Sequence, residues 1–148
     1  MTRRFWGERG TAIIETALTL PLLLLVSVGI FEFGRAYQTW QVLTNAAREG
    51  ARVAVLPNVA PGAPQARALA YMQSGQLSNA TAATITVNKA VPISLGAAGT
   101  ATGSRVTVSY PFQFIMLQPV ARLIVAGSMT GAPIVKTASA EMRNETQF

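Results

Sequence analysis

The chain has no cysteine, no histidine and no aspartate, and only 12% of its residues are charged. Without cysteine and histidine, disulfides, thiolate chemistry and the usual zinc sites are excluded. A Ser-His-Asp triad and a Cys-His pair are excluded for the same reason. We therefore expect no catalytic residue, no cofactor and no bound metal.

The few charges are mostly basic, and the net charge is +6. Of the 12 lysines and arginines, Arg3, Arg4 and Arg9 lie within the first ten residues, and the others are spread out without a cluster of bases and aromatic residues. This distribution disfavours a nucleic-acid partner. A basic segment before an apolar run is typical of a cytoplasmic flank, so residues 1–10 are predicted to be a basic leader peptide.

Residues 11–31 form one apolar run in which Glu15 is the only charged residue. A helix of this length reaches roughly 30 Å, the thickness of the hydrocarbon core of a bilayer. A cleaved secretory signal is the rival interpretation, but residues 27–35 (SVGIFEFGR) offer no convincing small-x-small cleavage site. The run therefore favours a retained membrane span, with a kink or a short unwound stretch expected at Pro21.

The apolar run continues without a break into a second helical stretch that reaches about residue 55, so residues 11–56 are predicted to be one long helix. Residues of its outer half recur at three- and four-residue steps, which predicts a packed face: Phe33, Tyr37, Trp40, Thr44, Ala47, Ala51 and Ala54. Tyr37 and Trp40 fit a membrane interface or packing on a sheet. Ala46, Gly50 and Ala54 form a candidate helix-packing ridge, directed at another subunit or at the chain's own sheet.

Residues 57–148 are predicted to be an extracytoplasmic α+β domain. A Pro-rich linker precedes a short helix at residues 65–73, with Ala66, Leu69 and Ala70 on one side. Alternating residues predict strands at 84–91, 105–114 and 133–143, with a loose turn at 92–104. Residues 115–126 are expected to be a short helix broken at Pro119, and residues 144–148 to be frayed. The fold class is therefore α+β, a long N-terminal helix packed on a small antiparallel sheet.

Glu15 raises the question of how a carboxylate is tolerated in hydrocarbon. It can snorkel to the cytoplasmic boundary, or it can find a cationic partner. If a peptidase cuts between Gly10 and Thr11, the new α-amino group of Thr11 provides that partner on a neighbouring subunit. Gly10 and Thr11 are therefore the predicted processing site, and Glu15 is the predicted assembly residue.

Three stretches of the sequence resemble the TadE-like pilus-assembly proteins: RGTAIIE (9–15), LTLPLLLL (18–25) and GIFEFGRAYQTWQVLTNAAREGAR (29–52). The stretches VTVSYPFQF and TASAEMRNE also resemble later strands of that family. The resemblance implies a type IV pilin-like minor pilin, or pseudopilin, of the Tad/Flp system, which assembles adhesive pili and is related to secretion systems.

The resemblance also implies partners and a location. A prepilin peptidase would cut after Gly10, and the mature chain would meet other pilins and minor pilins, the inner-membrane assembly platform and the lipid bilayer. The protein would be a single-pass protein of the bacterial inner membrane, with a cytoplasmic N-terminus and a periplasmic C-terminal domain, and would be available for incorporation into the pilus.

Two other functions remain open on the sequence alone. The first is an uncleaved, membrane-anchored module for binding or adhesion. The second is a hydrolase that pairs Lys89 or Lys136 with a serine, for which the candidates are Ser94, Ser109 and Ser139. No spacing supports such a dyad, so we expect a protein that is not an enzyme.

Overall fold

The structure is a computed structural model that describes residues 5–124, 127 and 129–145. It divides into two compact units. The first contains Met1–Arg35 and Phe114–Gly131, and the second contains Ala36–Gln113 and Ala132–Phe148. Helix α1 (Phe5–Ala54) contributes residues to both units, which differs from the predicted division at residues 56 and 57.

Helix α1 confirms the expected single long helix, although it begins within the predicted leader. Residues 1–4 of that leader lie outside the described residues. The helix continues through Pro21, so the expected unwound stretch is absent from this part of the described chain. Proline removes only one backbone donor, and the leucine-rich turns around it favour helix strongly enough to continue.

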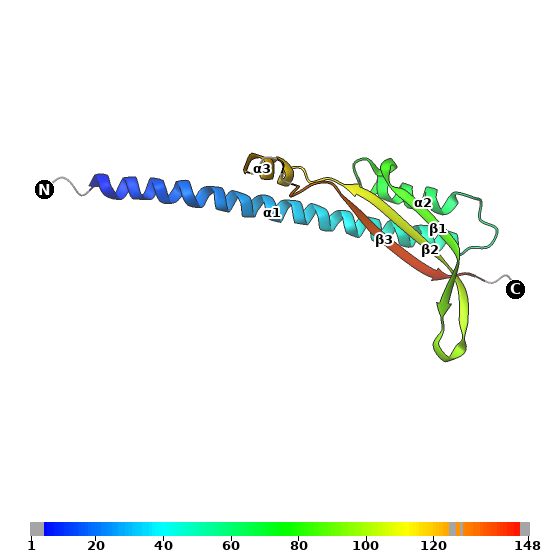
Figure 1. Ribbon diagram of the computed structural model, residues 1–148. Helices are drawn as coiled ribbons and strands as arrows, with labels where there is room; N and C mark the ends of the chain where they lie inside the picture. Colours follow the sequence, from blue (N-terminus) through cyan, green and yellow to red (C-terminus); the bar gives the residue numbers. More distant parts are fainter. Residues whose placement is uncertain (1–4, 125–126, 128, 146–148) are drawn as a thin grey trace. The chain divides into compact units, whose positions relative to one another are not determined.

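The second unit is built around a three-stranded antiparallel sheet in the order β1-β2-β3 (Figure 1). Its strands are β1 (Thr84–Ser94), β2 (Thr100–Phe112) and β3 (Ile134–Arg143). The central strand alternates as predicted, because Val106, Val108 and Tyr110 are buried while Thr107 and Ser109 are less so. Pro111 lies near the end of β2, where only β3 pairs with the strand.

The predicted loose turn at residues 92–104 is wrong over most of its length. Pro92 to Ser94 pair with Thr102 to Thr100, so that the ladder extends almost to the hairpin tip. The tip is the short 3-10 helix η2 (Gly96–Ala98), closed by a 2.8 Å hydrogen bond from Leu95 N to Gly99 O. Backbone pairing needs no apolar alternation, which is why the side-chain pattern did not reveal it.

Helix α2 (Ala63–Ser74) confirms the expected short helix, and Pro64 lies in its first turn. Its buried side is not the predicted one. Pro64, Ala68 and Met72 are buried at four-residue steps, whereas Ala66 and Ala70 are exposed. The chain then passes through the 3-10 helix η1 (Ala80–Ala82), and Ser78 O accepts a hydrogen bond from Tyr110 Oη of β2.

Helix α3 (Leu117–Ile124) belongs to the first unit and contains Pro119 without a break. Pro119 is the third residue of the helix, where a backbone N–H has no partner within the helix in any case. Figure 1 shows α3 beside α1. The expected break at Pro119 is therefore wrong.

The expected fraying of the C-terminus is wrong for the two residues of that segment that the structure describes. Asn144 N donates to Thr102 O at 3.0 Å, and Glu145 N donates to Val55 O at 3.1 Å. The Asn144 amide also accepts from Ser104 Oγ at 2.7 Å and donates to Lys89 O at 3.1 Å. Residues 146–148 lie outside the described part of the chain.

The end of α1 packs on the sheet and α2 within the second unit. Leu43, Ala46, Ala47, Ala51 and Ala54 of α1 are buried there, together with Ala68, Met72, Val106, Val108 and Phe112. Ser104 Oγ also donates to Ala54 O at 3.5 Å. This arrangement confirms the predicted α+β class.

Candidate functional site

The first part of α1 is apolar and has no covering from the described residues. Every residue from 11 to 27 is exposed, and Leu23 is 62% exposed. An 18-residue window of α1 has a mean hydropathy of 2.2, and none of it is buried. The helix is therefore long and apolar enough to cross a membrane, as expected from the sequence.

The hydroxyl groups of Thr16, Thr19 and Ser27 in this segment are satisfied inside the helix. Thr16 Oγ1 donates to Ala12 O at 2.8 Å, Thr19 Oγ1 to Glu15 O at 2.9 Å, and Ser27 Oγ to Leu23 O at 2.8 Å. A hydroxyl bonded to the carbonyl of the preceding turn needs no water, so these residues are compatible with hydrocarbon. Only the Glu15 carboxylate remains as an ionisable group within residues 11–31.

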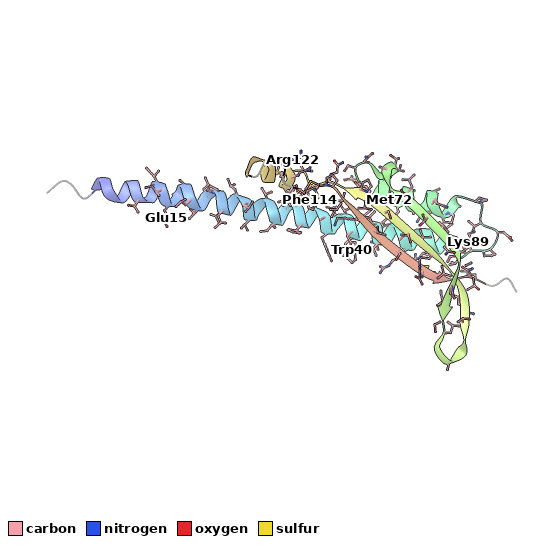
Figure 2. All side chains as sticks on the ribbon, viewed as in Figure 1. Glu15, Trp40, Met72, Lys89, Phe114 and Arg122 are labelled. Atoms are coloured by element: carbon pink, nitrogen blue, oxygen red, sulfur yellow. The ribbon has the colours of Figure 1, made fainter. Side chains whose placement is uncertain are left out.

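The predicted processing and assembly residues lie close together on α1. Glu15 follows Thr11 by four residues, so both lie on one side of the helix about 6 Å apart along its axis. Both are exposed, and Figure 2 labels Glu15 on the first part of α1. A Cβ at Gly10 would meet nothing within 4 Å. The structure thus leaves these three residues accessible to other molecules.

Glu32, the residue directly after the apolar run, is fully buried. Its Oε1 accepts hydrogen bonds from the backbone N–H groups of Ile115 at 2.8 Å and Met116 at 2.6 Å. Its Oε2 accepts from Arg35 Nη2 at 3.0 Å. Backbone donors and a guanidinium together stabilise an ionised carboxylate away from water.

The sequence identified only one of these contacts of Glu32. The three-residue spacing to Arg35 predicts an ion pair on a helix surface, and the pair exists, but its carboxylate is buried. The two backbone donors lie 83 and 84 residues further along the chain. The available signal was the position of Glu32 between Phe31 and Phe33, where a solvated charge is unexpected.

The candidate ridge packs inside the second unit. Ala46 and Ala54 are buried, and a Cβ at Gly50 would lie 3.1 Å from Pro64 O, 3.1 Å from Val106 Cγ1 and 3.2 Å from Ala68 Cβ. The ridge therefore serves the packing of α1 on the chain's own α2 and β2. Packing within the chain accounts for the burial of these three residues, and the alternative of a contact with another subunit stays a prediction.

The aromatic residues of the predicted packed face are exposed. Phe33 is 69% exposed, Tyr37 62% and Trp40 45%, which contradicts packing of these residues on the sheet. Tyr37 and Trp40 lie side by side, with ring centroids 6.1 Å apart. The buried side of this part of α1 is instead formed by Ala36, Thr39, Leu43 and Ala46, one residue before the predicted positions.

Further along α1, Glu49 forms a small ion-pair cluster on the surface. It binds Arg52 at 3.2 Å and Arg67 of α2 at 2.9 Å. Exposed pairs of this kind contribute at most about 1 kcal/mol each. The cluster therefore supports the contact between α1 and α2 and has no feature of a binding site.

Lys136 and Ser109 of the hydrolase hypothesis have other neighbours. Lys136 Nζ lies 4.9 Å from the centroid of the Phe112 ring, and partial burial lowers the pKa of Lys136. Ser109 Oγ lies 3.3 Å from Thr137 Oγ1.

Among the described residues, no group of three or more His, Cys, Asp or Glu side chains comes together to hold a metal ion.

Comparison with known proteins gives a family match. The family model described as TadE-like protein matches residues 10–52, a segment that begins at Gly10 and ends in α1. No curated protein and no solved structure matches the chain. Residues 10–52 are therefore similar to the TadE-like family, which confirms over that segment the resemblance found in the sequence.

Proposed function

We propose that this chain is a minor pilin, or pseudopilin, that takes part in assembling a Tad/Flp-type adhesive pilus after cleavage between Gly10 and Thr11. The TadE-like match at residues 10–52 points to an association with Tad pilus components. The role is structural and involves no catalysis. Its partners are a prepilin peptidase, other pilins and the inner-membrane assembly platform.

The observation that carries the proposal is the uncovered apolar part of α1 with one accessible carboxylate. Residues 11–27 have no covering within the described chain, so this surface is available for lipid and then for the helices of other subunits. An ionised carboxylate costs about 3 kcal/mol at the centre of a membrane helix, and this is the upper limit for Glu15, which lies four residues into the run. The ammonium of Thr11 on a neighbouring subunit offsets that cost, but it exists only after cleavage. It meets Glu15 only when the two helices are shifted along their axes by one particular distance.

Cleavage is tested by the N-terminal sequence of the protein extracted from membranes of cells that contain the peptidase. We expect the mature chain to begin at Thr11. Gly10→Ala should leave the precursor uncut, and because a Cβ there meets nothing within 4 Å, the folded chain tolerates it. Gly29→Ala is the matched control, since Gly29 lies in the same helix with the same open space and should be processed normally.

An intact N-terminus in such cells would contradict the proposal. It would favour the uncleaved, membrane-anchored module for binding or adhesion, because no ammonium would then be formed beside Glu15. Cutting of Gly10→Ala together with normal processing of Gly29→Ala would contradict only the assignment of Gly10.

The role of Glu15 is tested separately from cleavage. Glu15→Ala and Glu15→Gln should be cleaved and should fold normally, because Glu15 is exposed, but they should reduce the number of pili per cell. Thr19→Ala is the control on the same helix, since its hydroxyl bonds only to backbone of its own helix. Normal piliation of both Glu15 variants would contradict the proposed pairing.

A further inference from the structure

The segment around the start of α3 presents an apolar surface beside the end of the membrane-span candidate. Ile115 is 56% exposed and Met116 is 47% exposed. On α1 of the same unit, Phe31 and Phe33 are exposed as well. Residues 114–121 (FIMLQPVA) contain no charged residue, and Arg122 and Arg35 supply the nearest basic groups on these two elements.

Glu32 fixes the level of this segment along α1. Its carboxylate holds the backbone N–H groups of Ile115 and Met116 at 2.8 and 2.6 Å. Glu32 follows the apolar run of residues 11–31 by one residue, so Ile115 and Met116 lie at the outer boundary of a span of roughly 30 Å. Gly131 also lies against the start of α3, because a Cβ added at Gly131 would lie 2.7 Å from Gln118 N.

The same contacts remove the carboxylate from the surface. Glu32 is the only acidic residue between Glu15 and Glu49, and it is fully buried. Among the residues that the structure describes, the surface at this level therefore presents aromatic and aliphatic side chains together with Arg122 and no acidic group, since Arg35 is paired with Glu32. That composition suits the boundary between acyl chains and phosphate headgroups, where apolar side chains insert and basic groups meet phosphate.

We propose that residues 114–119, which lead into α3, form a second membrane-contact element, which lies in the outer lipid interface and is held there by Glu32. The occupant of the apolar surface is lipid, because the surface is continuous with the exposed apolar part of α1. The inference deepens the proposed function and rests on its membrane anchor. As a consequence, lipid at the outer boundary of the span contacts both α1 and the segment that leads into α3.

The chain contains no cysteine, so single cysteines can carry one probe each. Full-length protein is labelled with an environment-sensitive fluorophore at Leu23, Met116 or Ala66 and reconstituted in vesicles of phosphatidylethanolamine and phosphatidylglycerol. Leu23 reports the anchor, Met116 reports the proposed element, and exposed Ala66 of α2 is the control outside it. We then compare how strongly the fluorophore at each of the three positions is quenched by a lipid that carries a spin label on its acyl chain.

We expect quenching at Met116 within about twofold of that at Leu23, and little quenching at Ala66. Strong quenching at Leu23 with a solvated, unquenched Met116 would overturn the inference and leave the anchor in place. A Met116 probe that is shielded from water but not quenched by lipid would overturn it in favour of a protein partner. An unquenched Leu23 would overturn the anchor, and the inference with it.

The positioning role of Glu32 is tested with the same probe at Met116. Glu32→Ala leaves two backbone N–H groups without their acceptor, so quenching at Met116 should fall at least about twofold while quenching at Leu23 is unchanged. Glu32→Gln keeps an acceptor oxygen and should give a smaller loss. Glu49→Ala, which removes another glutamate paired with an arginine three residues later on α1, is the control and should change neither signal. Unchanged quenching at Met116 in Glu32→Ala would overturn the role of Glu32.

Discussion

At the scale of single residues, Gly50 sets how closely α1 approaches its neighbours. Two atoms of α2 (Pro64 O and Ala68 Cβ) and one of β2 (Val106 Cγ1) lie 3.1 to 3.2 Å from the place where a Cβ would be. Glycine within a helix costs about 1 kcal/mol relative to alanine. The close approach of α2 and β2 gives a physical reason for that cost.

Replacement of Gly50 by leucine should therefore destabilise the second unit by about 1 to 3 kcal/mol through overpacking. Gly34→Leu is the matched control, because Gly34 lies on the same helix with nothing within 4 Å of a Cβ. The control should be neutral or more stable, since leucine is the better helix former. Thermal unfolding of the full chain in detergent, followed by circular dichroism, measures both. Equal effects would contradict the close packing at Gly50.

Asn144 is a second residue with a specific role, because it holds the segment directly after β3 against the sheet. Its side chain accepts from Ser104 Oγ at 2.7 Å and donates to Lys89 O at 3.1 Å. Ser104 is fully buried, so its hydroxyl would lack its closest partner without Asn144.

The contact between Asn144 and Ser104 should therefore appear as a coupling energy. In a double-mutant cycle of Asn144→Ala and Ser104→Ala, we expect a coupling of about 1 kcal/mol in the free energy of unfolding. Chemical denaturation of the full chain in detergent provides the four values. Strict additivity of the two single changes would contradict the hydrogen bond.

At the scale of secondary-structure elements, α2 shows why a short helix is hard to orient from sequence. Alanine, leucine and methionine occur on several sides of it, so several buried faces fit the pattern equally well. Contact with α1 and the sheet selects Pro64, Ala68 and Met72. The choice is made by the partner surface and not by the helix itself.

Two alanines of α2 distinguish the observed face from the predicted one. Ala68→Leu should lower the free energy of unfolding by about 1 to 3 kcal/mol, because Ala68 is fully buried. Ala70→Leu, at an exposed position of the same helix, should change it by less than about 0.5 kcal/mol. Thermal unfolding measures both variants. If Ala70→Leu lowered the free energy of unfolding more than Ala68→Leu, the predicted face would be the buried one.

At the scale of the whole molecule, the two units differ in what makes them stable. The second unit has a buried apolar core from α1, α2 and the sheet. The first unit contains the exposed apolar helix and the α3 segment held by Glu32. The second unit should therefore fold in water, whereas the first unit needs lipid or a protein partner.

A shortened chain tests this difference. Residues 36–113, joined by a flexible linker to residues 132–148, should be soluble without detergent and unfold cooperatively. The physical reason is that the core residues of the second unit are all retained. Sedimentation and thermal unfolding provide the measurement. Aggregation of this chain in the absence of detergent would show that the second unit depends on the removed segments.

The sequence by itself determined the features that depend on local order. The length of the apolar run predicted a helix long and apolar enough to span a membrane, the absence of proline over residues 22–56 predicted one long helix, and alternation predicted the central strand. Each of these signals lies within one continuous stretch, because helix and strand periodicity is a property of neighbouring residues. The match at residues 10–52 belongs to the same class of local information.

Only the tertiary structure decided which faces are buried and which polar groups find partners. Glu32 meets backbone donors 83 and 84 residues away, Asn144 meets Ser104 at a separation of 40 residues, and the aromatic side of α1 remains exposed. The physical reason is that burial depends on a partner surface, and the partners of Glu32 and Asn144 come from distant parts of the chain.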